Sequence, residues 1–374
     1  MACAKTETWP GQRCVVPAKS SFHLFHCSGS LFMCSLDGSD RSTPAPSSFY
    51  WKRQDLVEQL RPLDFGSQNE LSEIERNYCA YYRIDMESRL PGVSHRLGYF
   101  ESLGYRVALH VFRPAQARGT VLVMHGYFDH SGLYGHLIRD LLEQNLAVII
   151  YDLPGHGISS GEPVSIRKFE DYQQVLDDGI ATCCGHLPQP WYAVGQSTGG
   201  AVLLDNLLTH RYPQDQALFR HIVLLAPLVR PANFRKGVLL HTLVSPFLRT
   251  WKRAFTDNSN DSSFIRFVRR HDPLQSQVLS VEWVTALRKW VKRIEAMPPF
   301  EAQVTIVQGK QDTTVDWRHN LRVLRAKFPG VAIHYLPQGR HHLVNESGEL
   351  REQIFAIIRS KFAAERETHA RVDG

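Results

Sequence analysis

Short, continuous apolar runs recur along the middle of the chain and mark buried strands. Strands that lack polar alternation are buried on both faces, as in a parallel sheet covered by helices. Most of these runs are separated by stretches with helical spacing, which predicts right-handed crossovers between parallel strands. The runs are Thr120 to Met124, Ala147 to Tyr151, Trp191 to Val194, Ile222 to Leu225, Val304 to Val307 and Ala332 to Leu336.

Two runs that precede this region have a different pattern. Residues 95–102 and 105–114 alternate apolar and polar positions around the turn Leu103-Gly104, which predicts an antiparallel hairpin. Residues 69–84, further upstream, have the spacing of an amphipathic helix. We therefore predict an α/β protein with a mostly parallel, doubly wound sheet and an antiparallel N-terminal hairpin. The apolar face of the upstream helix comprises Leu71, Ile74, Tyr78 and Tyr81.

One interval between predicted strands is too long for a single crossover. Residues 230–293 contain two or three helical runs, which predicts an inserted helical cap over the C-terminal edge of the sheet, where open α/β sheets bind ligands. This segment holds thirteen Lys and Arg against four Asp and Glu, a net charge of +9, whereas the whole chain carries +6. The positive charge is therefore concentrated in the predicted cap.

The two ends of the chain differ from its middle in composition. Residues 1–48 are rich in Ser, Pro, Gly and Cys without a sustained period, so we predict a disordered leader. An N-terminal helical extension is expected at 49–94, the main domain at 95–365 with its cap at about 230–293, and a flexible tail at 366–374. Four of the seven cysteines lie in the first 34 residues and none has zinc-type spacing, which favours free thiols in a reducing compartment.

No apolar run reaches the roughly 20 residues that a membrane span needs. The start of the chain also lacks the apolar run of a signal peptide. We expect a cytoplasmic protein. Its basic cap suits either phosphate head groups or peripheral contact with an anionic membrane surface, and the alternative is that these cations form a solvated face. A nucleic-acid-binding motif is absent from the sequence, so the positive charge does not predict a nucleic-acid partner.

The pentapeptide GQSTG, residues 195–199, directly follows a predicted strand and precedes a helical run. This is the setting of a nucleophile elbow. The sharp turn strains the serine, the two glycines remove side chains that would clash, and the helix N-terminus favours developing negative charge. Ser197 is therefore the predicted nucleophile.

A serine hydroxyl is a weak nucleophile at neutral pH, so it needs a base and a group that orients the base. Asp312 and His341 each lie just past the end of a predicted strand, on the same edge of the sheet as Ser197. The order Ser, Asp, His fits a nucleophile elbow. Asp316 is an alternative acid and His342 an alternative base, because adjacent residues point in different directions and only one histidine can face Ser197.

Two backbone N–H groups are expected to hold an oxyanion. One belongs to Thr198, immediately after the nucleophile, and the other to Tyr127, in the turn His125-Gly126-Tyr127 that ends the first buried strand. Gly126 permits the close approach of this turn.

Taken together, these motifs resemble the monoacylglycerol lipase and lysophospholipase branch of the α/β-hydrolases, a branch also described as serine aminopeptidase-like. The resemblance extends over roughly Gly98 to Lys361. It rests on the runs HGYFDHSG from His125, DLPGHG from Asp152, GQSTGG from Gly195, GKQD from Gly309 and GRHHLVNE from Gly339.

The resemblance implies the α/β-hydrolase fold and a carboxylic ester hydrolase that forms an acyl-enzyme on a single-chain lipid ester, such as a lysophospholipid or a monoacylglycerol, without a metal or organic cofactor. The family patterns HxLxxE and GxxD place His341 and Asp312 in the catalytic positions, and His156 of the DxxGHG turn is expected to be structural. Tyr127 departs from the animal monoacylglycerol lipases, in which a small residue usually follows HG.

Two alternative functions stay open at this point. One is a peptidase of the proline-iminopeptidase type, which needs carboxylates near the site; the other is a non-catalytic binding protein on the same fold, which predicts a missing triad member. The aromatic residues of the cap are expected either to shape an acyl tunnel or to form the core of the cap. These residues are Trp251, Phe255, Phe264, Phe267, Trp283 and Trp290.

Overall fold

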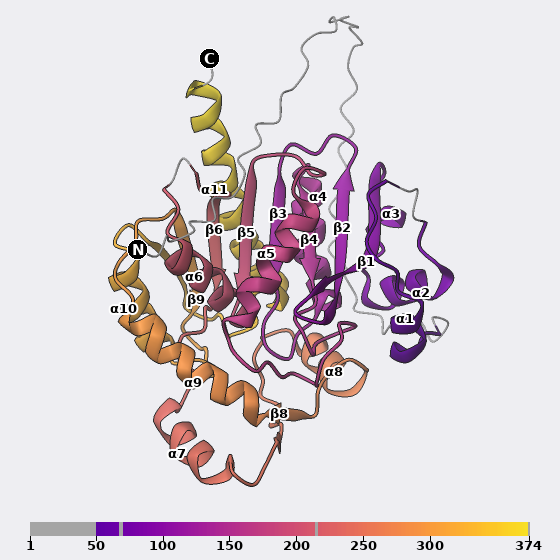
Figure 1. Cartoon of the computed structure of the whole chain (residues 1–374). Coiled ribbons are helices and arrows are strands. Elements are labelled where there is room, and N and C mark those ends of the chain that lie inside the picture. The colour runs from indigo at the N-terminus through magenta and orange to yellow at the C-terminus, as the bar shows by residue number, and fades with distance from the viewer. Residues whose placement is uncertain (1–49, 67–69, 214–215, 373–374) are drawn as a thin grey trace, which may run out of the picture. The chain divides into compact units, whose positions relative to one another are not determined.

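The computed structural model describes residues 50–66, 70–213 and 216–372, so the predicted leader at 1–48 lies outside the described residues. An eight-stranded sheet with the order β1-β2-β4-β3-β5-β6-β9-β10 forms the centre of the molecule (Figure 1). All six predicted buried strands are present. The strands are β1 Val93–Ser102, β2 Tyr105–Pro114, β3 Thr120–Met124, β4 Ala147–Tyr151, β5 Trp191–Gln196, β6 Phe219–Leu225, β9 Val304–Gly309 and β10 Ala332–Leu336.

The predicted hairpin is confirmed. Strand β1 pairs antiparallel with β2, and β2 pairs antiparallel with β4, whereas the neighbours from β4 to β10 are parallel. Leu103 and Gly104 have φ angles of 50° and 79°, because a two-residue hairpin turn that matches strand twist needs positive φ at both positions. The sheet is therefore mostly parallel with an antiparallel start.

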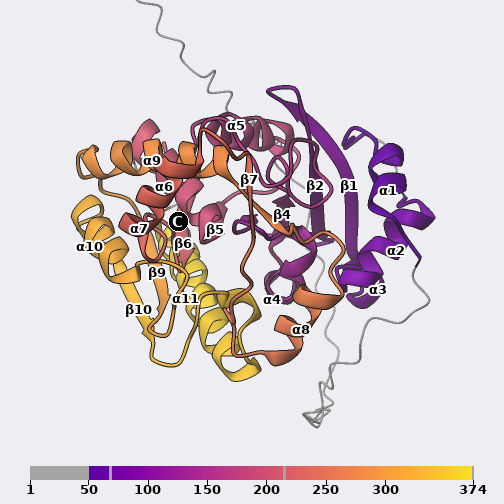
Figure 2. The same ribbon diagram turned by 90° about the horizontal axis from the view of Figure 1, so that it is seen from below.

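Helices cover both faces of the sheet, as Figure 2 shows. Alternate residues of a strand point to opposite faces; Leu122 packs with α5, α6, α9 and α10, whereas Val121 and Val123 pack with α2, α4 and α11. The helices are α1 Arg53–Gln59, α2 Glu73–Tyr82, α3 Met86–Arg89, α4 Gly135–Glu143, α5 Asp171–Cys183, α6 Thr198–His210, α7 Phe234–Val244, α8 Ser262–Arg270, α9 Val281–Ala296, α10 Trp317–Lys327 and α11 Gly348–Val372.

Helix α2 begins later than the pattern suggests, at Glu73, because Ser72 caps it. The Ser72 side chain accepts from the Glu75 N–H, and the Glu75 carboxylate accepts from the Ser72 N–H at 2.7 Å, which satisfies two free donors of the first turn. The buried face is centred on Tyr78 and Tyr82, whereas Tyr81, expected on that face, is only partly buried. The Tyr82 hydroxyl donates to Asp272, 190 residues away, a contact that helical spacing does not encode.

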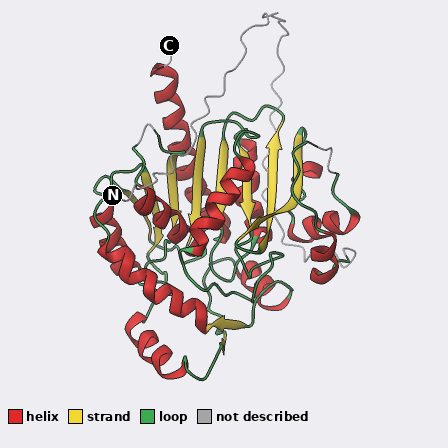
Figure 3. Ribbon diagram, in the orientation of Figure 1, coloured by secondary structure: helices red, strands yellow, loops and turns green. Residues whose placement is uncertain are grey.

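The long interval between β6 and β9 forms α7, β7 (Thr250–Lys252), α8, β8 (Val278–Ser280) and α9. Residues 230–293 are called the cap segment below. They lie beyond the ends at which the parallel strands finish, and β7 pairs antiparallel with β8 as a separate ribbon (Figures 1 and 3).

Helix α11 continues to Val372, past residue 366, where the sequence predicts a flexible tail. None of the described helices combines the length and the apolar character needed to cross a membrane.

Candidate active site

Ser197 occupies the turn between β5 and α6 with φ 52° and ψ −111°, a backbone conformation that residues other than glycine rarely adopt. The two glycines of the motif are required by close contacts. A Cβ at position 195 would lie 2.7 Å from the Gly200 nitrogen, and one at position 199 would lie 2.2 Å from the Met124 oxygen. The sequence GQSTG therefore folds into the predicted elbow, with Ser197 8% exposed at its tip.

The structure brings Ser197, His341 and Asp312 into one hydrogen-bonded chain. The His341 Nε2 atom lies 3.0 Å from the Ser197 hydroxyl, and His341 Nδ1 lies 2.7 Å from Asp312 Oδ2. The other carboxylate oxygen of Asp312 accepts from the backbone N–H groups of Thr314 and Val315. With Nδ1–H donating to Asp312, the Nε2 lone pair faces the serine, which is the arrangement that proton transfer from serine requires.

Burial and charge act in opposite directions on this pair. Burial would lower the pKa of His341, but the adjacent Asp312 carboxylate outweighs it, so the His341 pKa is raised above its ordinary value of 6.5. Burial would likewise raise the pKa of Asp312, yet His341 and the two backbone donors hold it below its ordinary value. The carboxylate thus stays ionised beside an imidazole of increased basicity.

The two alternative residues are engaged elsewhere. Asp316 caps α10 by accepting from the His319 N–H at 3.2 Å. The His342 Nε2 atom lies 3.1 Å from Asp129 Oδ2. Only Asp312 and His341 of the two candidate pairs therefore lie in the chain to the nucleophile.

The turn after β3 lies directly against the nucleophile. A Cβ on Gly126 would approach the Ser197 Cβ to 3.4 Å, so the glycine allows the turn to close on the serine. Within the described part of the chain, neither the Tyr127 nor the Thr198 backbone N–H donates a hydrogen bond to another residue. Both amides are thus without a hydrogen-bond partner among the described residues, and their role as oxyanion donors stays a prediction.

The cap segment supports the loop that carries the base, a feature that the sequence pattern did not reveal. The Asn258 carbonyl accepts from the N–H groups of both His341 and His342, at 3.0 and 2.7 Å. Buried Glu346, the last residue of the HxLxxE pattern, accepts from the backbone N–H groups of Arg340 and Asn260 at 2.6 and 2.9 Å. Glu346 is part of the sequence motif and could have indicated this support, because a buried carboxylate needs several hydrogen-bond donors around it.

A second buried hydrogen-bond network, centred on Asp272, was not predicted from the sequence either. Asp272 of the cap segment accepts from the Tyr82 hydroxyl at 2.7 Å, from His130 Nε2 at 3.0 Å and from Gln275 Nε2 at 2.9 Å. Burial alone would raise the pKa of Asp272, but the adjacent His130 has the opposite and larger effect, so the pKa lies below its ordinary value. This carboxylate joins α2, the segment after β3 and the cap, three regions far apart in sequence.

The DxxGHG turn is a structural element, as expected for His156. Asp152 accepts from the backbone N–H groups of Ser131 and Ile158, at 2.7 and 2.8 Å, and so pins the turn. Burial lowers the pKa of His156 to about 3, and its Nδ1 atom bonds to the Pro154 carbonyl at 2.9 Å. A neutral histidine held by its own turn does not reach the nucleophile.

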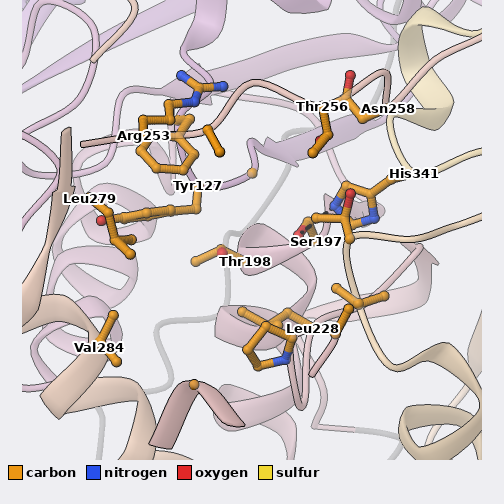
Figure 4. A pocket seen from close by; sticks show the side chains of 18 of the residues that line it. Tyr127, Ser197, Thr198, Leu228, Arg253, Thr256, Asn258, Leu279, Val284 and His341 are labelled. Carbon is orange, nitrogen blue, oxygen red and sulfur yellow. Dashed lines mark hydrogen bonds between the residues drawn. The ribbon is translucent and has the colours of Figure 1, made fainter. Parts of the chain in front are cut away.

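A cavity of about 600 Å³ opens at Ser197, between the sheet and the cap segment. Figure 4 shows Ser197 and His341 together on one side of this cavity, with Leu279 and Val284 of the cap on the opposite side. Its volume lies within the range of about 300–1,000 Å³ typical of small-molecule sites. Among the described residues that line the cavity, Asp129 is the sole carboxylate, and its Oδ2 atom contacts His342, the Tyr134 hydroxyl and the Gly126 N–H.

The cap aromatics divide between the two expected roles. Two of them pack away from the cavity: Trp290 stacks on Phe169 at 4.5 Å, and Phe267 packs beside Tyr81 and Tyr82. The four that line the cavity are Trp251, Phe255, Phe264 and Trp283.

One group of side chains has the composition of a metal site. The ligand atoms of Cys79, His95 and His110 lie within 4.8 Å of one another, all buried. Both nitrogens of His95 are engaged, 3.0 Å from His110 Nδ1 and 3.1 Å from Glu87, whereas the buried His110 Nε2 atom has no hydrogen-bond partner among the described residues. Cys79, Cys183 and Cys184, the cysteines in the described part of the chain, are free thiols.

Comparison with known proteins identifies the family of this chain. Residues 115–348, more than half of the chain, match the family described as Hydrolase_4: Serine aminopeptidase, S33. Phospholipase YtpA of Bacillus subtilis (strain 168) is 25% identical, a match that covers 64% of this chain and 93% of YtpA. Monoglyceride lipase of Homo sapiens is 26% identical over 64% of this chain and 81% of its own length. An uncharacterized abhydrolase domain-containing protein of Dictyostelium discoideum is 26% identical, but the chain spans only 21% of it.

Solved structures show the same fold at lower identity. A soluble variant of monoglyceride lipase from Saccharomyces cerevisiae superposes with a TM-score of 0.62 and 17% identity, covering 73% of this chain and 95% of that one. Monoacylglycerol lipase of Paleococcus ferrophilus gives a TM-score of 0.57 at 19% identity, over 69% of this chain and 98% of that one. The chain therefore belongs to the Hydrolase_4 (Serine aminopeptidase, S33) family and has the α/β-hydrolase fold.

Proposed function

We propose that this protein is a serine hydrolase of carboxylic esters that acts on single-chain lipids such as lysophospholipids or monoacylglycerols. The observation that carries the proposal is the Ser197–His341–Asp312 hydrogen-bonded chain at the edge of an apolar cavity. The relatives named as a monoglyceride lipase and a phospholipase support the lipid ester as substrate class.

The proposed reaction has two halves. In the first, the Ser197 oxygen attacks the ester carbonyl carbon while His341 Nε2 takes the serine proton. The N–H groups of Tyr127 and Thr198 stabilise the oxyanion, and on its collapse the leaving alcohol takes the proton from His341. In the second half, water attacks the acyl-enzyme with His341 again as base, which releases the carboxylic acid and restores Ser197.

The form of the cavity favours an ester with an apolar acyl chain. Its walls carry aliphatic side chains of the cap segment, among them Val238, Leu240, Val244, Leu279 and Leu287. Burial of an acyl chain against such a wall contributes about 0.8 kcal/mol per methylene.

A peptidase of the proline-iminopeptidase type is disfavoured by the same cavity. Recognition of a free amino terminus needs a carboxylate, and the one carboxylate that lines the cavity, Asp129, is bound to His342. The non-catalytic alternative predicts that a triad member is missing, whereas all three residues are present and joined.

We further propose that the cap segment contacts an anionic membrane surface. Leu239, Leu243 and Phe247, in and after α7, are 65%, 63% and 85% exposed, and basic residues flank them at Lys236 and Arg249. Large apolar side chains gathered beside cations are typical of a surface that inserts into the headgroup region. A substrate dissolved in that membrane would then enter the cavity directly.

Covalent labelling and a substrate panel test the proposed function. A fluorophosphonate should label the wild-type protein, and hydrolysis should be compared among a lysophosphatidylcholine, a monoacylglycerol, a p-nitrophenyl ester and an aminoacyl-p-nitroanilide. Ester hydrolysis with inactivity toward the anilide is the expected result. Cleavage of the anilide alone would establish the peptidase alternative, and no labelling together with no turnover would establish the non-catalytic one.

A further inference from the structure

The turn that carries the Tyr127 N–H, residues 125–129, is held from two directions. The core holds its start: the Gly126 N–H donates to the Tyr134 hydroxyl at 3.0 Å and to Asp129 at 3.2 Å. Its next two side chains, those of Tyr127 and Phe128, instead contact the cap segment. Half of the proposed oxyanion hole is therefore attached to an element that lies outside the sheet.

Tyr127 is fixed at both its ring and its hydroxyl. The ring stacks on Trp283 of α9, with centroids 3.8 Å apart and planes at 21°. The hydroxyl donates to the Val164 carbonyl at 2.7 Å and accepts from the Ser280 N–H at 3.3 Å. Burial raises the pKa of this phenol well above its usual range, so it remains a donor to Val164. Trp283 and Ser280 belong to the cap segment, whereas Val164 and His156, whose ring lies 5.4 Å from that of Tyr127, do not.

The groups that contact the Tyr127 hydroxyl are also connected to each other. The Ser280 side chain caps α9 by accepting from the Trp283 N–H at 3.1 Å, and it also donates to the Ser165 hydroxyl at 2.9 Å. Val164, whose carbonyl receives the Tyr127 hydroxyl, has φ 49°, which is rare for a β-branched residue and persists only where surrounding contacts impose it. The first turn of α9, the Val164 loop and Tyr127 are thus held together.

Phe128 has a second link to the cap segment. Its φ angle is 72°, again outside the usual range, and the Arg253 guanidinium lies 3.9 Å from its ring centroid. Arg253 is in turn held by Gln275, whose side-chain oxygen accepts from Arg253 Nη1 at 2.6 Å. Figure 4 shows Tyr127 and Arg253 as neighbours at the cavity.

We propose that the cap segment, through Trp283 and Ser280, sets the position of the Tyr127 N–H and so completes the oxyanion hole. Tyr127 is then a positioning residue through its side chain as well as an oxyanion donor through its backbone. An oxyanion donor must lie about 2.7–3.1 Å from the developing charge, so a small displacement of the turn removes its contribution. A small residue in place of Tyr127 would lack this contact with the cap. The inference rests on the proposed ester hydrolysis and extends it.

Two variants test whether Tyr127 and Trp283 position the oxyanion donor or only shape the cavity. Tyr127→Phe removes the bonds to Val164 and Ser280 but keeps the ring, and Trp283→Leu removes the stack. Each should lower kcat by about 10- to 100-fold while KM stays near the wild-type value, because the lost stabilisation is specific to the transition state. Trp283→Phe, which keeps a ring for Tyr127, should recover most of the lost rate.

A pair of inhibitors reports on the oxyanion directly. A long-chain alkyl trifluoromethyl ketone forms a tetrahedral oxyanion adduct with an active serine, whereas the matching trifluoromethyl carbinol binds in the cavity without one. In both variants the inhibition constant of the ketone should rise by about the same factor as kcat falls, and that of the carbinol should not change. Equal losses for ketone and carbinol would show that Tyr127 and Trp283 only shape the cavity, and an unchanged ketone would show that they do not act on the oxyanion.

Trp290→Leu is the matched control, because Trp290 lies on the same helix but stacks on Phe169. It should lower the melting temperature at least as much as Trp283→Leu and leave the ratio of the two inhibition constants at the wild-type value. A changed ratio in Trp290→Leu would overturn the specific role of Trp283. If Trp283→Leu does not fold, Tyr127→Phe, which removes one oxygen, decides the question. Wild-type protein that is inactive toward every ester would overturn the proposed function, whereas active wild type with unaffected variants overturns this inference alone.

Discussion

The sheet and the cap segment differ in how completely their residues are buried, although both line the cavity. Every residue of β3, β4, β5 and β9 is buried, and the helices beside them fill two continuous cores. In the cap segment, α8 has no fully buried residue and α7 buries only His241, whereas α9 buries one face, including Trp283 and Trp290, against the core. Burial on both faces leaves little freedom in a strand, whereas an amphipathic cover has several ways to lie on a surface.

This difference divides the chemistry of the site. Ser197, Asp312 and His341 follow the ends of β5, β9 and β10, so the nucleophile, the acid and the base extend from the buried sheet. The cap segment holds the loops around them, through Asn258 at the base and Trp283 at Tyr127. Changes in the sheet residues should therefore abolish chemistry, and changes in the cap should alter its rate or the access of substrate.

The largest expected effect is that of Ser197→Ala. Loss of the nucleophile should reduce ester turnover by about 10⁶-fold without unfolding the protein, because Ser197 lines the cavity and the change removes a single oxygen atom. Turnover, fluorophosphonate labelling and the melting temperature check this. Labelling that persists in the variant would place the nucleophile elsewhere, and the division between sheet and cap would lose its basis.

Replacement of the two adjacent histidines, one at a time, tests which of them acts on Ser197. His341→Ala should lose about as much activity as Ser197→Ala, and the double variant should be hardly worse than either, because the two residues act as a unit. His342→Ala should keep most of its turnover, since His342 contacts Asp129 rather than Ser197. Single-turnover rates for the four proteins test this. An inactive His342→Ala beside an active His341→Ala would contradict the geometry.

Asp312→Asn should change both the rate and its pH dependence. The base must be neutral, and the Asp312 carboxylate raises the His341 pKa above 6.5, so wild-type kcat/KM should fall as the pH drops through that raised value. Without the carboxylate, burial is the main remaining influence and lowers the pKa, so the acidic limb should move to lower pH. The rate at the plateau should fall by about 10⁴-fold. An acidic limb that stays in place would show that another group titrates.

The smallest catalytic effect is expected on the outer face of the cap. Leu243→Ser combined with Phe247→Ser should leave turnover of a soluble short-chain ester unchanged but weaken sedimentation with anionic phosphatidylserine vesicles by at least about tenfold, given the apolar surface removed. Tyr212→Ser is the control, because Tyr212 is 42% exposed and lies outside the cap segment. Equal vesicle binding by all three proteins would exclude α7 as the contact surface.

Much of the site was predictable from the sequence for a physical reason. A buried strand followed by GQSTG leaves Ser197 few conformations, and parallel strands bring Asp312 and His341 to the same edge of the sheet. The choice between His341 and His342 came from the family pattern, and hydrogen bonds to Asp312 and Ser197 agree with it in the structure. Such features depend on local backbone geometry and strand order, both of which leave periodic traces in a sequence.

Only the tertiary structure decided which distant groups meet. The buried Tyr82 bonds to Asp272, 190 residues away, and the Tyr127 ring stacks on Trp283, 156 residues away. The six cap aromatics likewise have one pattern in the sequence but two roles in the fold, since Trp290 joins the core and Trp251 lines the cavity. Helical spacing specifies which side chains share a face, whereas the partner of that face is set by packing between segments that no local pattern connects.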